Sequence, residues 1–226
     1  MPYSHYALAQ RVASEGALPI VDEPQYYLGA FMPDIRYFTK LPRENYHFPL
    51  SRLEPYRERG DVHPDFLLGY AVHLLIDEEW ESPAAKRLYQ QSFPPGIRGR
   101  MTRGLQAVAF ELYCLRQPVD MVCLKPVENA LTESLGVTAG HIDRAVRSMQ
   151  SYLERRDLAG ALEMAKETQL FPRSRLKTVE RVVAAMRVRP VRACANAIVD
   201  RASSPMLARL VRSVLRRLEL EGRAAA

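Results

Sequence analysis

The sequence has few cysteines and no long apolar run. Its 226 residues contain three cysteines, an odd number without C-x-x-C spacing, so we expect neither a disulfide framework nor a cysteine-ligated zinc site. No stretch approaches 18 consecutive apolar residues, and no basic segment followed by an apolar core opens the chain. We therefore expect a cytoplasmic protein without a transmembrane helix.

Several sequence patterns that define large enzyme classes are also missing. The chain has no G-x-S-x-G nucleophile motif, no phosphate-binding glycine loop and no G-x-G-x-x-G dinucleotide fingerprint. It also has no run of alternating apolar and polar residues of the kind that predicts a strand. These absences argue against serine hydrolases of the nucleophile-elbow type, nucleotide-binding enzymes of the common motifs and β-rich folds.

The apolar spacing is instead helical along most of the chain, which predicts an all-α fold. Residues 20–62 are the exception, because closely spaced prolines predict an irregular segment. We expect a metal-binding helical core over residues 1–125 and basic C-terminal helices over residues 126–226 that pack on it as one compact unit. Helices are predicted at 3–16, 65–80, 83–92, 98–116, 126–135, 141–156, 158–168, 174–187, 190–202 and 205–221.

The most informative local pattern is a histidine four residues before an aspartate in apolar sequence. On a helix, His73 and Asp77 lie on one face about a turn apart. An ionised carboxylate is costly to bury without a partner, and a divalent cation compensates that cost while it orients the imidazole. The pair therefore predicts a metal site.

Three further candidate ligands occur upstream in sequence that is apolar or rich in proline. His5 falls in the first turn of a predicted helix that Ser4 would cap. Asp34 follows Pro33, and His47 lies in a loop flanked by prolines. His63 and His141 are expected at a helix start and at the surface, without a role in the metal site.

These patterns together resemble the zinc-dependent phospholipase C family, which is related in fold to the S1/P1 nucleases. The resemblance covers roughly residues 1–115. It is carried by the early helical His5, the G-x-x-x-P-D segment of residues 29–34, His47-Phe48, and the G-x-x-x-H-x-x-x-D helix of residues 69–77.

The resemblance implies a multi-helix phospholipase C/P1 nuclease-like domain, here with additional C-terminal helices. It implies that Asp34, His47, His73 and Asp77 hold one metal and that Asp77 bridges to a second, which His5 also binds. In secreted members the N-terminal amine is a further ligand, and here the chain starts Met1-Pro2.

The family's late-helix H-x-x-x-E pair falls on Ala107 and Glu111. The carboxylate of Glu111 remains a candidate ligand, but the imidazole is missing. We expect one or two zinc ions rather than three, and the ligand types also suit iron or manganese.

By this resemblance we expect a metal-dependent hydrolase of a phosphoester or related substrate. The lack of a signal segment, which departs from the secreted members, leads us to expect an intracellular one. A metal-bound hydroxide would be the nucleophile, and Asp34 would be the catalytic group that aligns the water. A first alternative is a non-hydrolytic metalloenzyme, a lyase or cyclase of small-molecule biosynthesis on the same scaffold. Ala107 favours this alternative, because it reduces the metal set.

A second alternative rests on the charge of the C-terminal part. Residues 141–226 contain 18 Lys and Arg against 9 Asp and Glu. Residues 131–149 resemble a helix-turn-helix with Gly136 in the turn, so a DNA-binding regulator is the second alternative. The would-be recognition helix after Gly136 has few side chains that could contact bases, namely His141, Arg144 and Arg147. We therefore do not expect nucleic acid as the partner. The amphipathic final helix would suit the core, a second copy of the chain or a lipid surface equally well.

Overall fold

The computed structural model describes the chain except residues 1, 156, 168–176, 178–179, 182 and 225–226. The described residues are helical and contain no strand, which confirms the all-α prediction. The elements are α1 (Pro2–Glu15), α2 (Glu23–Phe31), η1 (Met32–Ile35), α3 (Arg36–Thr39), η2 (Arg43–Asn45), η3 (Leu50–Leu53), α4 (Glu54–Arg59), α5 (Pro64–Glu81), α6 (Pro83–Ser92), α7 (Pro95–Arg98), α8 (Arg103–Cys114), α9 (Ala130–Ser134), α10 (Ala139–Arg155), α11 (Leu158–Glu167) and α13 (Arg189–Ala224).

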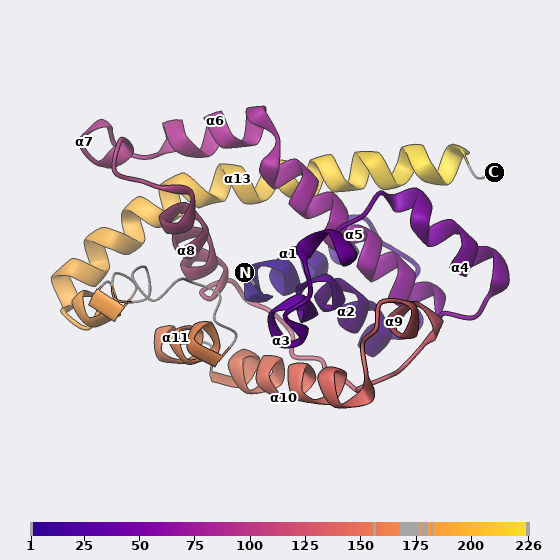
Figure 1. Ribbon diagram of the computed structural model, residues 1–226. Coiled ribbons are helices and arrows are strands. Elements are labelled where there is room, and N and C mark those ends of the chain that lie inside the picture. The colour runs from indigo at the N-terminus through magenta and orange to yellow at the C-terminus, as the bar shows by residue number, and fades with distance from the viewer. Residues whose placement is uncertain (1, 156, 168–176, 178–179, 182, 225–226) are drawn as a thin grey trace.

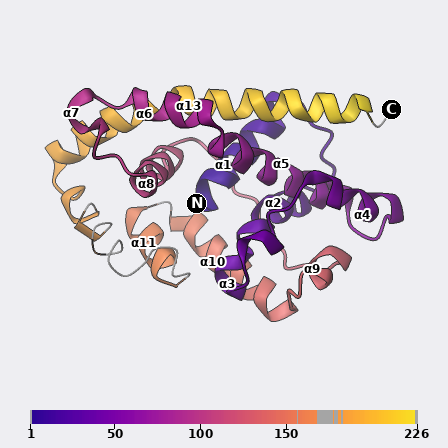
Figure 2. The same cartoon turned by 45° about the horizontal axis from the view of Figure 1, so that its top comes forward.

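Helix α5 is the centre of the fold, with α1 and α2 against it, α13 along one side, and α9 to α11 on the opposite side of α1 and α2 (Figures 1 and 2). Eleven of its 18 residues are buried, His73 among them. The imidazole of His63 caps its first turn, since Nδ1 accepts the amide hydrogen of Asp65 at 3.2 Å. The prediction that His63 lies at a helix start is therefore confirmed.

Helices α2 and α5 cross at two glycines, Gly29 and Gly69. A Cβ atom on Gly29 would lie 2.0 Å from the carbonyl oxygen of Phe66, and one on Gly69 would lie 1.9 Å from that of Tyr26. No other residue type fits either position without moving a backbone. This close approach holds the end of α2, and Asp34 just beyond it, beside the middle of α5.

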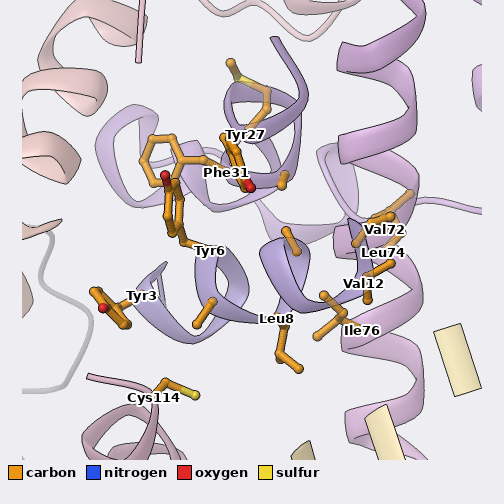
Figure 3. Packing of buried hydrophobic residues seen from close by; sticks show 14 of the residues in the cluster. Tyr3, Tyr6, Leu8, Val12, Tyr27, Phe31, Val72, Leu74, Ile76 and Cys114 are labelled. Atoms are coloured by element: carbon orange, nitrogen blue, oxygen red, sulfur yellow. The ribbon is translucent and has the colours of Figure 1, made fainter. Parts of the chain in front are cut away.

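Aromatic side chains fill the space between α1 and α2, and aliphatic ones fill the space between α1 and α5. The ring of Tyr6 stacks on that of Tyr27 with centroids 4.6 Å apart. Leu8 and Val12 lie on the side of α1 that faces Ile76 of α5 (Figure 3). Burial of these side chains fixes α1 against both neighbours, and with it the position of His5.

The prediction that residues 20–62 are irregular is wrong over much of its length. Helix α2 begins in this segment because Asp22 caps it, accepting the amide hydrogen of Gln25 at 3.1 Å. Pro24 stands in the first turn, where its missing N–H group has no helical partner to lose, so it starts a helix rather than breaking one. His47 does lie in a loop, between η2 and η3.

The prediction of separate helices at 190–202 and 205–221 is also wrong, because α13 runs through both ranges with Pro205 inside it. An internal proline costs about 3 kcal/mol or more, and here buried residues on both sides of it offset that cost. Ala202, Met206, Leu207 and Leu210 are all at most 3% exposed. The predicted helix at 98–116 is shortened to α8, which begins at Arg103, because residues 99–102 are not helical. The predicted helix at 126–135 is reduced to α9, and part of 174–187 lies outside the described residues.

Candidate metal centre

Four separate segments bring the predicted ligands together. α1 supplies His5, η1 supplies Asp34, the loop after η2 supplies His47, and α5 supplies both His73 and Asp77. Ligand atoms lie within 4.8 Å of one another in two overlapping groups, His5 with Asp34 and His73, and His47 with His73 and Asp77. His73 is common to both groups, so the five residues form one cluster.

His73 is oriented by a backbone carbonyl. Its Nδ1 lies 2.7 Å from the carbonyl oxygen of Ala30, and because that oxygen can only accept, Nδ1 carries the hydrogen. Burial, followed by the charge of His5, lowers the pKa of His73 to about 3. The ring is therefore neutral, and Nε2 presents a lone pair to the cluster, as a metal-binding histidine with a carbonyl partner does.

Asp77 accepts hydrogen bonds on both oxygens. Nε2 of His5 lies 3.0 Å from Oδ1, while Nε2 of His47 and Nη2 of Arg43 lie 2.8 and 2.6 Å from Oδ2. Burial alone would raise the pKa of Asp77, but the hydrogen bonds from His47 and His5 and the nearby charges hold it well below its usual range. Asp77 is therefore ionised at neutral pH, as a ligand must be.

Asp34 is buried behind the ring of His5, with Oδ2 3.6 Å from Nδ1 of His5. Burial would raise its pKa, yet electrostatic interactions with its neighbours, His5 among them, lower it. The rings of His5 and His73 stack with centroids 4.0 Å apart. Asp34 and Asp77 thus stand at opposite nitrogens of His5.

The cluster fits a divalent cation. Nε2 of His47 lies 3.3 Å from Nε2 of His73 and 2.8 Å from Oδ2 of Asp77, so the three atoms are close enough to share one cation. Nδ1 of His47 is buried and has no hydrogen-bond partner among the described residues. Three imidazoles and two carboxylates are the ligand types that zinc, iron and manganese share.

Glu111 is not part of this cluster. Its oxygens accept the amide hydrogens of Tyr3 at 3.0 Å and Ser4 at 2.9 Å, and the hydroxyl of Tyr152 donates to Oε1 at 2.9 Å. Glu111 therefore caps the start of α1 from a distant part of the chain. The expectation that Ser4 caps this helix is wrong, because Ser4 lies within its first turn.

Ala107 lies where the resemblance implied a further imidazole. It lines a small cavity of about 60 Å³ together with His5, Asp77 and Trp80. The remaining lining is mostly apolar. A small gap therefore lies next to Asp77, and His5 is the only other histidine or carboxylate among its lining residues.

A larger cavity of about 530 Å³ opens on the other side of Asp77. Arg43, His47 and Asp77 line one part of it, and Arg217 of α13 another. The sequence did not single out Arg43. The one sequence feature that could have indicated a role for Arg43 in the site is its position four residues before His47. The remaining lining residues are Phe48, Pro49, Leu50, Leu74, Glu78, Glu81 and Glu221.

The predicted helix-turn-helix is present in outline. Gly136 has φ +70°, and α10 begins three residues later. His141 is partly buried with Nδ1 3.1 Å from Oγ1 of Thr138, so the expectation that it lies at the surface is only partly met. Arg147 pairs with Asp143 at 2.5 Å on the exposed face of α10.

Comparison with known proteins leaves the family open. No protein-family model, curated protein sequence or solved structure matches the chain. Among the described residues, no helix is both long and apolar enough to cross a membrane. The fold and site therefore define an all-α chain with a buried histidine and aspartate cluster beside an open cavity.

Proposed function

We propose that the chain is a metal-dependent hydrolase that acts on a phosphoester or a related substrate. The observation that carries the proposal is the convergence of His5, Asp34, His47, His73 and Asp77 from four segments, with His73 held in the tautomer that leaves Nε2 available. Zinc is the first choice of metal, with one or two ions per chain. A bound divalent cation supplies Lewis acidity, which polarises an ester oxygen and lowers the pKa of water.

The protein's own groups have distinct parts in this proposal. His73 and Asp34, which are buried, hold the cation. His47 and Asp77 also line the larger cavity and therefore lie between the buried ligands and the substrate. The apolar residues of that cavity exclude water from one side of the substrate.

Asp34 is expected from the sequence to align water as well as to bind metal. Its carboxylate is 3% exposed and does not line the larger cavity. Asp77 does line it, and its oxygens reach both halves of the cluster. We therefore assign Asp34 to metal ligation. Whether it also aligns water is decided by the activity and the zinc content of Asp34→Asn.

The proposal is tested by hydrolysis of bis(4-nitrophenyl) phosphate and 4-nitrophenyl phosphate with zinc-loaded protein. We expect activity that a chelator abolishes and zinc restores. Asp34→Asn keeps the size of the side chain but weakens ligation, so it lowers activity and zinc content together. Loss of activity with full zinc content would instead assign Asp34 the catalytic role. Zinc-loaded protein that cleaves neither these esters nor a wider phosphoester panel would contradict the proposal.

A non-hydrolytic lyase or cyclase is the second candidate, favoured by the gap at Ala107. A smaller metal set provides fewer groups to activate water, while it can still polarise a substrate. Reaction in ¹⁸O-labelled water separates the two candidates. Incorporation of the label into product supports the hydrolase, and unlabelled product supports the alternative.

A further inference from the structure

Arg43 is positioned by the same turn that positions His47. The carbonyl oxygen of Arg43 accepts the amide hydrogens of Tyr46 at 3.0 Å and His47 at 2.9 Å. The guanidinium of Arg43 and the imidazole of His47 are therefore positioned by the same short turn. Both reach Oδ2 of Asp77, at 2.6 and 2.8 Å.

Arg43 is at the same time accessible from the cavity. Its side chain is 47% exposed, against 7% for His47 and 18% for Asp77, and it lines the 530 Å³ cavity. Phe48 and Leu74 are also lining residues, so the cavity has an apolar part beside Asp77. Glu78, Glu81 and Glu221 line it as well, but Glu78 is paired with Arg217, and Glu81 is paired with Lys86 and Arg103. A ligand with an anionic group and a small apolar substituent matches this arrangement.

The charges of the cluster indicate when Arg43 becomes available to such a ligand. Arg43 bonds Oδ2 of Asp77, and Asp77 also belongs, with His47 and His73, to a group whose ligand atoms lie close enough to hold one cation. A divalent cation on that carboxylate would compete with the guanidinium for its oxygen and add two positive charges beside Arg43. The guanidinium would then be able to bind an anion.

We propose that Arg43 is the anion-positioning residue of this site. It bonds Asp77 when no cation is held, and it binds a phosphoryl or similar oxyanion when one is. An arginine suits this role because its planar fork donates two parallel hydrogen bonds to such a group. The inference rests on the proposed function, since it needs a cation at Asp77.

The alternative is that Arg43 is an ordinary ion-pair partner of Asp77. A half-exposed ion pair contributes little to stability. In that case removal of Arg43 changes neither cation nor anion binding by much. Anion affinity measured separately from cation content distinguishes the two roles without an activity assay.

The test uses phenylphosphonate, an anion with an apolar ring that the proposed reaction does not cleave. Zinc content is measured first, and phenylphosphonate is then titrated into zinc-loaded protein by calorimetry. Wild type, Arg43→Ala and Arg43→Lys are compared with Arg59→Ala, which removes an exposed arginine paired with Asp61 on a helix that does not line the cavity. Circular dichroism checks that each variant is folded.

We expect Arg43→Ala to keep its zinc and to bind phenylphosphonate about tenfold or more weakly than wild type. Arg43→Lys, which keeps the charge but not the fork, falls in between, and Arg59→Ala matches wild type. Zinc-loaded Arg43→Ala with wild-type affinity would overturn the inference and leave the proposed function standing. Loss of zinc in Arg43→Ala would also overturn it, because Arg43 would then support the cation site itself. Wild-type protein that binds no cation would overturn the proposed function and this inference with it.

Discussion

Glu111 holds the first turn of α1, and through that turn the position of His5. Its buried carboxylate satisfies two backbone amides that the helix leaves without partners and also accepts from Tyr152. A negative charge at a helix N-terminus is favourable, so this contact stabilises both the helix and its docking.

We predict that Glu111→Gln lowers the free energy of unfolding by about 1–3 kcal/mol, because the amide accepts on one oxygen only and lacks the charge. Zinc content should stay at the wild-type value. Urea denaturation and metal analysis of the same preparation measure both quantities. Loss of zinc without loss of stability would instead support the ligand role that the family resemblance implied.

The low pKa of His73 makes the stability of the metal-free protein depend on pH. The pKa is about 3 in the folded protein and about 6.5 in the unfolded chain, so the unfolded chain binds more protons between these values. The contribution of neutral His73 to the free energy of unfolding is therefore fully present above pH 6.5. It falls as the pH is lowered toward 3, by at most about 1.4 kcal/mol per pH unit.

Urea denaturation of chelator-treated protein between pH 7 and pH 4.5 tests this dependence. His73→Gln should show a smaller loss of stability over the same range. Asp34 and Asp77, whose pKa values are also lowered, add to the loss mainly below pH 4 in both proteins. An equal loss in wild type and His73→Gln would show that His73 is not the group responsible.

At the scale of elements, the contact of α2 with α5 decides where the ligands lie. Gly29 and Gly69 allow the two backbones to touch, so that Ala30 can accept from His73 across the contact. Gly29 of the G-x-x-x-P-D segment and Gly69 of the G-x-x-x-H-x-x-x-D helix therefore act through packing. Each allows the close approach of α2 and α5 that places Asp34 and His73 in one cluster.

We predict that Gly69→Ala lowers the free energy of unfolding by at least about 2 kcal/mol, since its Cβ would meet the carbonyl oxygen of Tyr26 at 1.9 Å. It should also reduce zinc content, because α2 must move. Gly99→Ala is the control, with no heavy atom within 4 Å of its added Cβ, and should change stability by no more than about 0.5 kcal/mol. Equal stability of the two variants would contradict the close crossing of α2 and α5.

The sequence predicted most of the long helices, although it divided α13 in two, and it predicted the short ones poorly. Apolar spacing is averaged over several turns, so it identified α1, α5 and α10. It could not identify α2, because that helix depends on a cap at Asp22 and a first-turn proline, and a proline such as Pro24 also indicates a helix break. The proximity of His5, Asp34, His47, His73 and Asp77 could be expected because histidines and aspartates stand out in apolar sequence, while their role as metal ligands stays a prediction.

Other features depend on contacts between distant segments. Glu111 reaches residues more than 100 positions away, and Arg43 meets Asp77 across 34 positions. No local pattern signals either contact. The ligand role expected of Glu111 therefore rested on resemblance alone, and Arg43 was not singled out.

At the scale of the whole molecule, α13 joins the basic C-terminal part to the core. Arg209 and Ser213 donate to Glu79 at 2.7 and 2.9 Å, and Arg217 pairs with Glu78 at 2.7 Å. Part of the positive charge of residues 141–226 is thus matched by the acidic end of α5. The amphipathic final helix packs on the core of its own chain, one of the three partners that its pattern allows.

We predict that Leu210→Ala lowers the free energy of unfolding by about 2–5 kcal/mol, because Leu210 is a fully buried residue of α13. Leu220→Ala, at a position 56% exposed on the same helix, should be nearly neutral. The fluorescence of Trp80, the single tryptophan, and circular dichroism should report the same transition in both variants. Separate transitions would mean that α13 and the metal-binding core unfold independently.

The most direct test of the metal centre is the metal content per chain of purified protein, measured by plasma mass spectrometry after reconstitution with zinc, iron or manganese. We expect one or two equivalents in wild type and in His141→Ala, since His141 lies outside the cluster. We expect a large loss in His73→Ala and in Asp77→Asn, the second variant guarding against a folding defect at the fully buried His73. Wild-type protein without bound metal, or folded variants that keep all of it, would contradict the proposed metal centre.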